Sequence, residues 1–109
     1  VYGSGKQTRS LCYVSDLVEG IFLAMQSSHW EPMNIGNPNE LTILEMADVI
    51  NQITGNKAAH VYQPLPPDDP QQRRPDISRA KERLGWEPKV SLMDGLSATL
   101  KYFQAEKIV

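Results

Sequence analysis

The chain has 109 residues, of which 40% are hydrophobic and 22% are charged, as is typical of a soluble globular domain. Its formal net charge of −2 excludes the clustered positive charge of a general nucleic-acid binder, and no run of about 18 apolar residues could span a membrane. A single cysteine, Cys12, cannot form an intramolecular disulfide, and residues 1–10 have no apolar secretory core. We therefore expect a cytoplasmic protein whose one domain buries roughly 65% of the surface of its unfolded chain.

The first motif is Gly-Ser-Gly at residues 3–5, which predicts a turn between two strands. A dinucleotide-binding loop would need a further glycine where Thr8 stands, and no helical pattern begins there. Gln7, Thr8 and Arg9 follow the turn directly. The planar guanidinium of Arg9 suits bidentate phosphate binding, although by itself this residue is interpreted as a solvated surface arginine.

Residues 10–14 are short, apolar and β-prone, and they predict a strand. Ser15 is expected to cap a helix over residues 16–26, with Asp16 in its first turn. The apolar residues of that helix recur at i, i+4 spacing, which gives it one apolar face, and Gly20 is expected to destabilise it by roughly 1 kcal/mol. Residues 33–36 predict a second short strand.

Thr42 and Glu45 form a capping box, which predicts a helix that ends at Gly55. Residues 60–63 alternate in polarity as a third strand would. Near the carboxyl end, Ser91 is expected to cap a last helix whose apolar residues Leu92, Leu96, Leu100 and Phe103 share one face.

Five of the eight prolines fall within residues 64–75, which we interpret as an ordered loop, with a mobile loop as the alternative. Pro75 restricts Arg74 to extended backbone, and a short helix over residues 77–84 follows until Gly85. The Arg73-Arg74 pair before this helix indicates an anion-binding strand end. The alternative is ordinary surface charge, paired with the nearby Asp68 and Asp69.

Other motifs are given structural interpretations. His29 and His60 have no metal-ligand spacing, and no G-x-S-x-G nucleophile motif is present. Cys12 is expected in the core, and both tryptophans, Trp30 and Trp86, are expected to pack against apolar neighbours. The whole pattern predicts an α/β fold in the order β, α, β, α, β, α, α: a small lobe with short strands and about four helices.

Three stretches carry a resemblance to a known family: V-Y-G-S-G-K-Q-T-R-S-L-C-Y-V-S-D-L-V-E-G-I, M-N-I-G-N-P-N-E-L-T-I-L-E-M-A and D-D-P-Q-Q-R-R-P-D-I-S-R-A-K-E-R-L-G-W-E-P. In this order they resemble the carboxy-terminal portion of the extended short-chain dehydrogenases/reductases of the NAD-dependent epimerase/dehydratase family, which act on nucleotide sugars. Within that family the pattern is most similar to the UDP-glucuronate decarboxylases. The resemblance extends from Val1 to about Phe103.

The resemblance implies a UDP-sugar site to which this chain contributes Val1, Tyr2, Gln7, Thr8, Arg9 and Arg73. It implies that Val1 and Tyr2 lie along the uridine and that Arg9 contacts the diphosphate. Arg73 would reach the diphosphate or the sugar from the opposite side, where it could also stabilise an enolate. The implied reaction is NAD-dependent oxidation at C4 of UDP-glucuronate, loss of CO2 through a 4-keto intermediate, and reduction to UDP-xylose.

The family's catalytic pair, Tyr-x-x-x-Lys on one helix, has no counterpart here, because Tyr2 and Lys6 have the spacing but flank the glycine turn. We therefore expect residues 1–109 to be a single carboxy-terminal nucleotide-sugar-binding domain without a Rossmann lobe. This domain is expected to be inactive alone and to bind neither NAD, metal, nucleic acid nor membranes. The alternatives are the same lobe of a related epimerase or 4,6-dehydratase, and a stand-alone module that forms homo-oligomers through an exposed former lobe interface.

Overall fold

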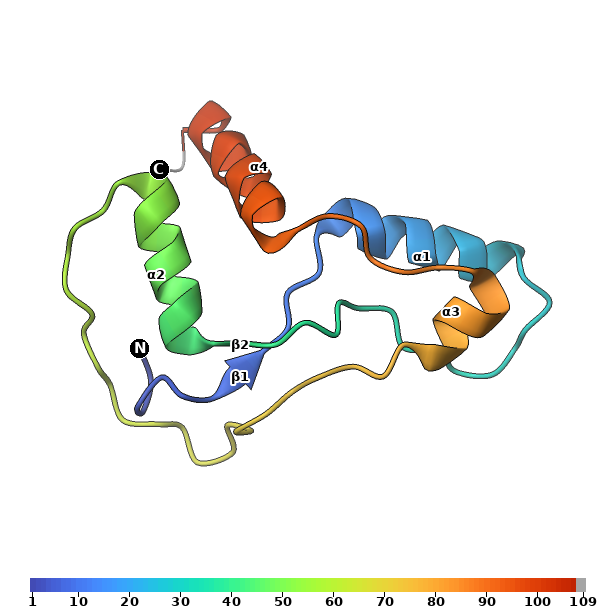
Figure 1. The fold of residues 1–109 in the computed structure, drawn as a ribbon, viewed down its shortest axis with the longest axis horizontal. Coiled ribbons are helices and arrows are strands. Elements are labelled where there is room, and N and C mark those ends of the chain that lie inside the picture. Colours follow the sequence, from blue (N-terminus) through green and yellow to red (C-terminus); the bar gives the residue numbers. More distant parts are fainter. Residues whose placement is uncertain (108–109) are drawn as a thin grey trace.

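A computed structural model describes residues 1–107 as four helices and two very short strands, which confirms the expected α/β class (Figure 1). The elements in chain order are β1 (Thr8–Arg9), α1 (Val14–Gln26), β2 (Leu41–Thr42), α2 (Ile43–Thr54), α3 (Ser78–Leu84) and α4 (Leu92–Ala105). None of the helices within the described residues is long and apolar enough to cross a membrane.

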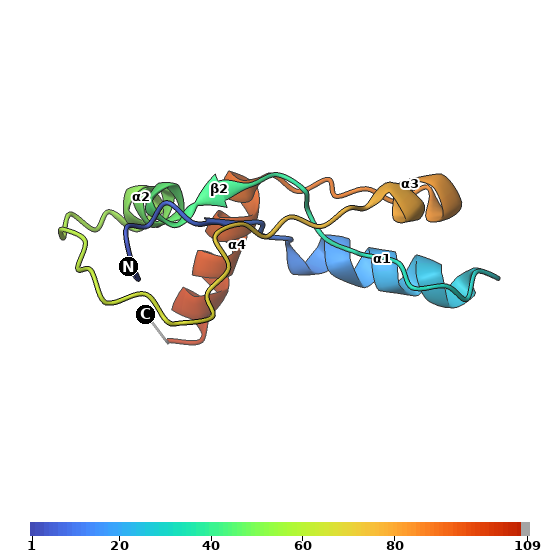
Figure 2. The same ribbon diagram turned by 90° about the horizontal axis from the view of Figure 1, so that it is seen from below.

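The elements form two groups that extended segments connect. Helices α1 and α3 pack together at one end, while α2, α4 and the β1–β2 pair lie at the other (Figure 1). The result is a flat, elongated molecule of 49 × 36 × 18 Å (Figure 2). Its radius of gyration is 16.3 Å, against about 13 Å for a compact domain of this length. Its accessible surface is 7784 Å², against about 6,100 Å² for a compact monomer, so the chain buries less surface than its length predicts.

The buried core lies between α1 and α3 and contains Trp86, Ile77 and Ala80. The indole N–H of Trp86 donates to the Asp16 carbonyl at 3.0 Å, which satisfies the one polar atom that this side chain takes into the core. A Cβ at position 20 would lie 2.6 Å from the Ile35 side chain and 3.1 Å from the Trp86 ring. Gly20 therefore permits the close packing of this core, which offsets its low helix propensity.

The start of α1 differs from the prediction. The helix begins at Val14 with Tyr13 as its N-cap residue, so Ser15 is not the cap. Asp16 is buried, and its carboxylate accepts a hydrogen bond at 3.0 Å from the backbone N–H of Val90. It thus holds a segment distant in sequence against α1, an interaction that local capping patterns do not reveal.

The predicted strands are mostly wrong, because a strand exists only where it finds a partner. Residues 10–13 and 33–36 are irregular, and residues 60–63 form only one parallel bridge, between Tyr2 and Gln63. The actual antiparallel pair is β1 with β2, in which Thr8 lies opposite Thr42. The predicted turn at residues 3–5 is confirmed, and Gly3 and Gly5 adopt positive φ values of 63° and 75°.

The predicted helix ends are confirmed wherever a local cap defines them. The hydroxyl of Thr42 accepts from the Glu45 N–H at 3.1 Å, and α2 stops before Gly55 in the left-handed region. The hydroxyl of Ser91 accepts from the Asp94 N–H at 3.2 Å at the start of α4. Gly85, also left-handed, ends α3.

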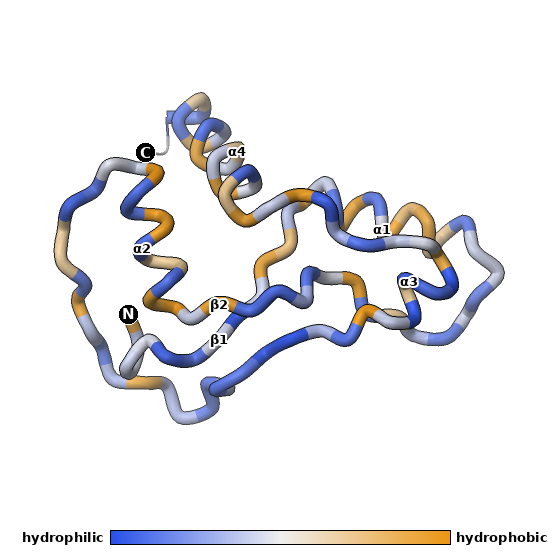
Figure 3. The backbone as a smooth tube through the Cα atoms, viewed as in Figure 1, coloured by the Kyte–Doolittle hydropathy of each residue, from blue (hydrophilic) through white to orange (hydrophobic). Residues whose placement is uncertain are grey.

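Many large apolar side chains stay exposed. Hydrophobic residues recur along α1, where they alternate with polar ones (Figure 3). Val14, Val18 and Phe22 form an exposed row on α1 at a spacing of four residues, with Met25 beside it. Trp30 is 91% exposed, so the prediction that it packs against apolar neighbours is wrong. Cys12 is half-buried rather than a core residue.

The two tryptophans provide a matched test of this core. We expect Trp86→Phe to lower the free energy of unfolding by roughly 1–3 kcal/mol, because it removes the bond to the Asp16 carbonyl and leaves a void. Trp30→Phe should leave that free energy unchanged within about 0.5 kcal/mol, since the side chain is exposed. Urea unfolding followed by circular dichroism measures both, and equal effects of the two changes would contradict the assigned core.

The start of α3 carries a perturbed carboxylate. Asp76 accepts hydrogen bonds from the hydroxyl and the N–H of Ser78, at 2.5 and 3.0 Å. These bonds, and to a smaller extent the charges of Arg74 and Arg79, lower the pKa of Asp76 below its ordinary value. The contribution of Asp76 to stability is therefore present above the pKa of an unfolded aspartate and is lost as the pH falls through the lower folded-state pKa.

Replacing Ser78 with alanine tests the cause of that shift. We expect the pKa of Asp76 to rise toward its ordinary value in Ser78→Ala, because the largest of the interactions that favour the charged form is removed. A carboxyl-carbon NMR titration measures the change. Ser28→Ala, at an exposed serine after α1, is the control and should leave the Asp76 titration where it is; an Asp76 pKa that does not move in Ser78→Ala would contradict the assignment.

Candidate functional site

The segment over residues 5–10 is held by hydrogen bonds on both sides. On one side, the first N–H groups of α2 donate to it, from Ile43 to the Gln7 carbonyl and from Leu44 to the Gly5 carbonyl, both at 3.1 Å. On the other side, the Thr8 N–H donates to the Gln71 carbonyl at 2.8 Å. The proline-rich segment, residues 64–75, therefore runs beside β1. Together these bonds fix the position of residues 5–10.

An open cleft of about 610 Å³ lies where these segments meet. Its lining residues are Arg9, Ser10, Leu11, Ile43, Met46, Arg73, Arg74 and Pro75. The two arginines assigned to the site from the sequence, Arg9 and Arg73, thus line one cleft although 64 positions separate them. The structure adds Arg74, which the adjacent arginine pair already indicated as part of an anion-binding strand end.

The Arg9 guanidinium makes three hydrogen bonds within the chain. It donates to the carbonyls of Thr8 and Pro70, at 2.6 and 2.8 Å, and pairs with the Asp69 carboxylate at 2.5 Å. The sequence-based alternative that Asp69 pairs with Arg73 or Arg74 is therefore wrong. Arg73 and Arg74 are exposed, and the backbone carbonyl of Arg73 accepts from the Ser10 hydroxyl at 3.3 Å.

Gln7 is buried, Thr8 is half-buried, and neither residue lines the cleft. Gln7 is 5% exposed, and its side-chain amide donates to the Tyr2 carbonyl at 2.9 Å and to Asp69 at 3.5 Å. The hydroxyl oxygen of Thr8 is buried and has no hydrogen-bond partner among the described residues. Both residues therefore shape the segment that carries Arg9.

Val1 and Tyr2 lie outside the arginine cleft. The amino group of Val1 donates to the Val61 carbonyl at 2.7 Å, and the Gln63 N–H donates to the Val1 carbonyl at 2.7 Å. Tyr2 is 56% exposed. Gln7 connects this end to the cleft, since its side-chain amide contacts both the Tyr2 carbonyl and Asp69.

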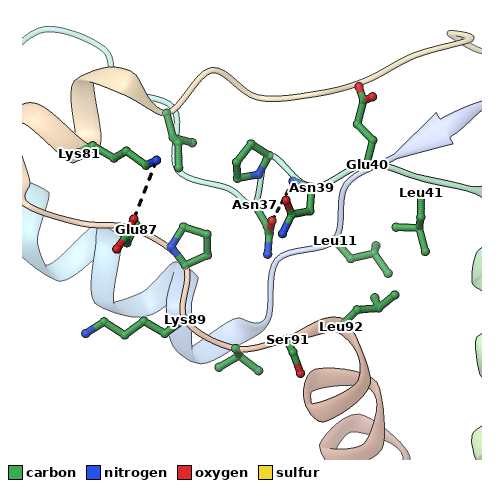
Figure 4. A pocket seen from close by; sticks show the side chains of 14 residues that line it. Leu11, Asn37, Asn39, Glu40, Leu41, Lys81, Glu87, Lys89, Ser91 and Leu92 are labelled. Carbon is green, nitrogen blue, oxygen red and sulfur yellow. Dashed lines mark hydrogen bonds and ion pairs between the residues drawn. The ribbon is translucent and has the colours of Figure 1, made fainter.

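A second hollow of about 390 Å³ lies between the loop at residues 37–41 and the segment before α4 (Figure 4). Its charges are mixed: the Lys81 ammonium lies 3.9 Å from the Glu87 carboxylate (Figure 4). The Lys89 ammonium lies 3.7 Å from the carboxylate of Glu19, a residue of α1 outside the lining of this hollow. Because each of these lysines already faces a carboxylate, this hollow has less unpaired positive charge than the arginine cleft.

The cysteine and histidine side chains within residues 1–107 have surroundings that suit structural roles. Burial, and next the charge of Asp16, raises the pKa of Cys12, which disfavours the thiolate. His60 pairs with Asp48 at 2.9 Å on the surface. Among the residues that the structure describes, no group of three or more histidine, cysteine or acidic side chains is placed to hold a metal ion.

The glycine turn does not fit a nicotinamide dinucleotide. Such a cofactor needs glycines at the amino end of a helix, whose N–H groups face the pyrophosphate. Residues 3–5 lead into β1, and a Cβ at position 5 would lie 2.5 Å from the Leu44 side chain, so Gly5 is required for packing against α2. Tyr2 and Lys6, on either side of this turn, share no helical face.

Comparison with known proteins identifies relatives of this chain. Residues 1–99 match the family model of GDP-mannose 4,6 dehydratase. The chain is 51% identical over 104 residues to UDP-glucuronic acid decarboxylase 1 of Arabidopsis thaliana, covering 95% of this chain and 24% of that protein. It is also 51% identical over 106 residues to UDP-glucuronic acid decarboxylase 1 of Danio rerio, covering 97% of this chain and 25% of that protein.

Solved structures show the same fold. UDP-glucose 4-epimerase of Thermotoga maritima, solved with UDP-glucose, superposes with a TM-score of 0.94 at 37% identity, over 98% of this chain and 35% of its own. UDP-glucuronic acid 4-epimerase of Bacillus cereus, solved with UDP-glucuronic acid and NAD, gives a TM-score of 0.90 at 32% identity, over 97% of this chain and 35% of its own.

The chain thus spans about a quarter of the length of the curated relatives it matches and about a third of these solved chains. The match nevertheless includes the glycine turn, β1 and the arginine pair, because it covers almost all of the present residues. The chain belongs to the GDP-mannose 4,6-dehydratase family, among the extended short-chain dehydrogenases/reductases.

Proposed function

We propose that this chain is the nucleotide-sugar-binding lobe of a UDP-glucuronate decarboxylase, an enzyme that converts UDP-glucuronate to UDP-xylose and CO2. The observation that carries the proposal is the cleft lined by Arg9, Arg73 and Arg74. Guanidinium groups make charge-assisted, bidentate hydrogen bonds to phosphate oxygens, and a nucleotide diphosphate offers several such oxygens close together. The identity of about 51% to two curated decarboxylases supports this substrate over other nucleotide sugars.

Within this proposal the arginines act from two sides. Arg9 binds the diphosphate from β1, while Arg73 approaches from the proline-rich segment across the cleft. Because Arg73 is exposed, its long side chain is free to reach the diphosphate or the sugar. A guanidinium near the sugar would stabilise the enolate that holds the negative charge after the 4-keto intermediate loses CO2. Gln7 and Thr8 shape the loop, and Val1 and Tyr2 contact the uridine after closure of the site.

The lobe is proposed to be inactive alone, because neither the glycine turn nor the Tyr2–Lys6 pair has the geometry of the family's cofactor site and catalytic pair. The proposed partner is a lobe that carries NAD and the catalytic tyrosine. In the related epimerase solved with UDP-glucuronic acid and NAD, this chain corresponds to 35% of the length.

Titration with UDP tests the binding role. We expect heat of binding for the 109-residue chain and loss of at least about tenfold in affinity for Arg9→Ala, since a charge-assisted bidentate contact is removed. Lys6→Ala removes the same charge from an exposed residue three positions before Arg9 and should change the affinity less than twofold. Equal losses in the two variants would show a general charge effect and contradict a specific role of Arg9.

A second candidate function is self-association of the 109-residue chain. The exposed apolar row of Val14, Val18 and Phe22 on α1 favours it, because contiguous apolar surface tends to become an interface. A concentration-dependent dimer in sedimentation, together with no heat of UDP binding, would support this candidate over the nucleotide-sugar lobe. UDP binding by a monomer would support the lobe.

An activity assay tests the proposed incompleteness. We expect no CO2 release from UDP-glucuronate when the 109-residue chain is supplied with NAD. The reason is that the glycine turn and the Tyr2–Lys6 pair lack the geometry of the family's cofactor site and catalytic pair. Labelled carboxylate measured as released CO2 gives the readout, and a full-length Arabidopsis thaliana decarboxylase serves as the positive control. Steady CO2 release by the 109-residue chain would overturn the proposal.

A further inference from the structure

The geometry points to Asp69 as the positioning residue of the anion site: its carboxylate holds the Arg9 guanidinium in one orientation and leaves part of it free for a phosphate. This inference deepens the proposed function, on which it rests for the identity of the ligand. It concerns the contact between Asp69 and Arg9. It assigns no contact between Asp69 and the substrate.

The hydrogen bonds of Arg9 divide its donors into two sets. A guanidinium has five N–H donors in one plane. The Nη1 group donates to the carbonyls of Thr8 and Pro70, and the Nη2 group donates to Oδ1 of Asp69. Three acceptors from two separate segments therefore fix the plane of the group. Among the described contacts, Nε–H and the second Nη2–H remain available for an incoming anion.

Asp69 is itself held in place. Its second carboxylate oxygen lies 3.5 Å from the side-chain amide of Gln7, and that amide also donates to the Tyr2 carbonyl at 2.9 Å. Gln7 is buried, so the support comes from the interior of the fold. The segment bearing Asp69 is fixed to β1 by the bond between the Thr8 N–H and the Gln71 carbonyl. Arg9 is thus pre-organised before any ligand arrives. This reduces the conformational entropy that its side chain loses on binding.

Removal of Asp69 should change the affinity for a diphosphate in opposite directions, depending on whether this carboxylate acts by orienting Arg9 or by its charge alone. A carboxylate beside Arg9 reduces the positive charge of the cleft, so on charge alone its removal should tighten the binding of a diphosphate. If Asp69 acts by orientation, its removal should weaken binding, because Arg9 then gains rotamers that must be lost again on binding. The sign of the change therefore decides between the two.

The experiment is a titration of the full 109-residue chain with UDP. We expect Asp69→Ala to weaken binding about tenfold, and Asp69→Asn, which keeps an oxygen acceptor, to weaken it about threefold. Asp68→Ala is the matched control, since it removes an exposed carboxylate one residue away for which no bond to Arg9 is present. It should bind as the unchanged chain does or slightly more tightly. In an Arg9→Ala background, Asp69→Ala should have no further effect, because Asp69 acts through Arg9.

A readout without ligand separates this inference from the proposed function. In ¹⁵N NMR spectra, the Nε–Hε signal of Arg9, assigned by its loss in Arg9→Ala, should stand apart from those of exposed arginines. It should merge with them in Asp69→Ala and stay apart in Asp68→Ala. If the unchanged chain binds no UDP, the proposed function fails, while this signal still tests the positioning role.

Two results would overturn the positioning role: an Arg9 signal that is the same with and without Asp69, or UDP binding that is unchanged or tighter in Asp69→Ala. Circular dichroism checks that each variant folds. Should Asp69→Ala unfold, Asp69→Asn decides the question by the same two measurements, and an unmoved Arg9 signal in that variant contradicts the role.

Discussion

The arrangement of the site depends on the backbone hydrogen bonds that hold residues 5–10 between the start of α2 and the proline-rich segment. The N–H groups of Ile43 and Leu44 have no partners within their own helix, because they belong to its first turn. They donate instead to the carbonyls of Gln7 and Gly5. The same segment uses the Thr8 N–H to bind the carbonyl of Gln71. Backbone N–H and carbonyl groups of residues 5–10, the start of α2 and the proline-rich segment thus pair with one another. As a result, Arg9 and Arg73 line one cleft.

Helices and turns could be predicted from the sequence because their signals are local. Thr42 and Glu45 lie within one helical turn, as do Ser91 and Asp94, so the capping residues specify where α2 and α4 begin. The glycines at positions 55 and 85 end α2 and α3 for a similarly local reason, since both need a positive φ. The start of α1 has no such side-chain cap, and it is the helix start that was predicted wrongly.

Strands and ion pairs could not be predicted, because their partners are distant in sequence. The segment at residues 33–36 has the composition of a strand but no ladder within the described residues. Asp69 is close in sequence to Arg73 and Arg74, yet it pairs with Arg9, which lies 60 positions away. The pairing follows from the backbone bond between Thr8 and Gln71, which brings the two segments side by side. Once a resemblance supplies the topology, the assignment of Arg9 and Arg73 to one cleft follows.

The same physical account explains why the chain has a detailed site and a small core. Within residues 1–107, Trp86 is the one large side chain that is fully buried, and it belongs to the α1–α3 group. The arginine cleft lies at the other group, where backbone and charge-assisted hydrogen bonds carry most of the order. Such bonds orient groups well but contribute only about 0.5–1.5 kcal/mol each, far less than a buried apolar core supplies in total. A chain built this way would gain stability from any partner that covers its exposed apolar row, since binding to the folded state alone shifts the folding equilibrium. Placement of the candidate site and stability of the fold are therefore separate properties here: hydrogen bonds within residues 1–107 position the arginine cleft, whereas a partner that covers the apolar row would add stability.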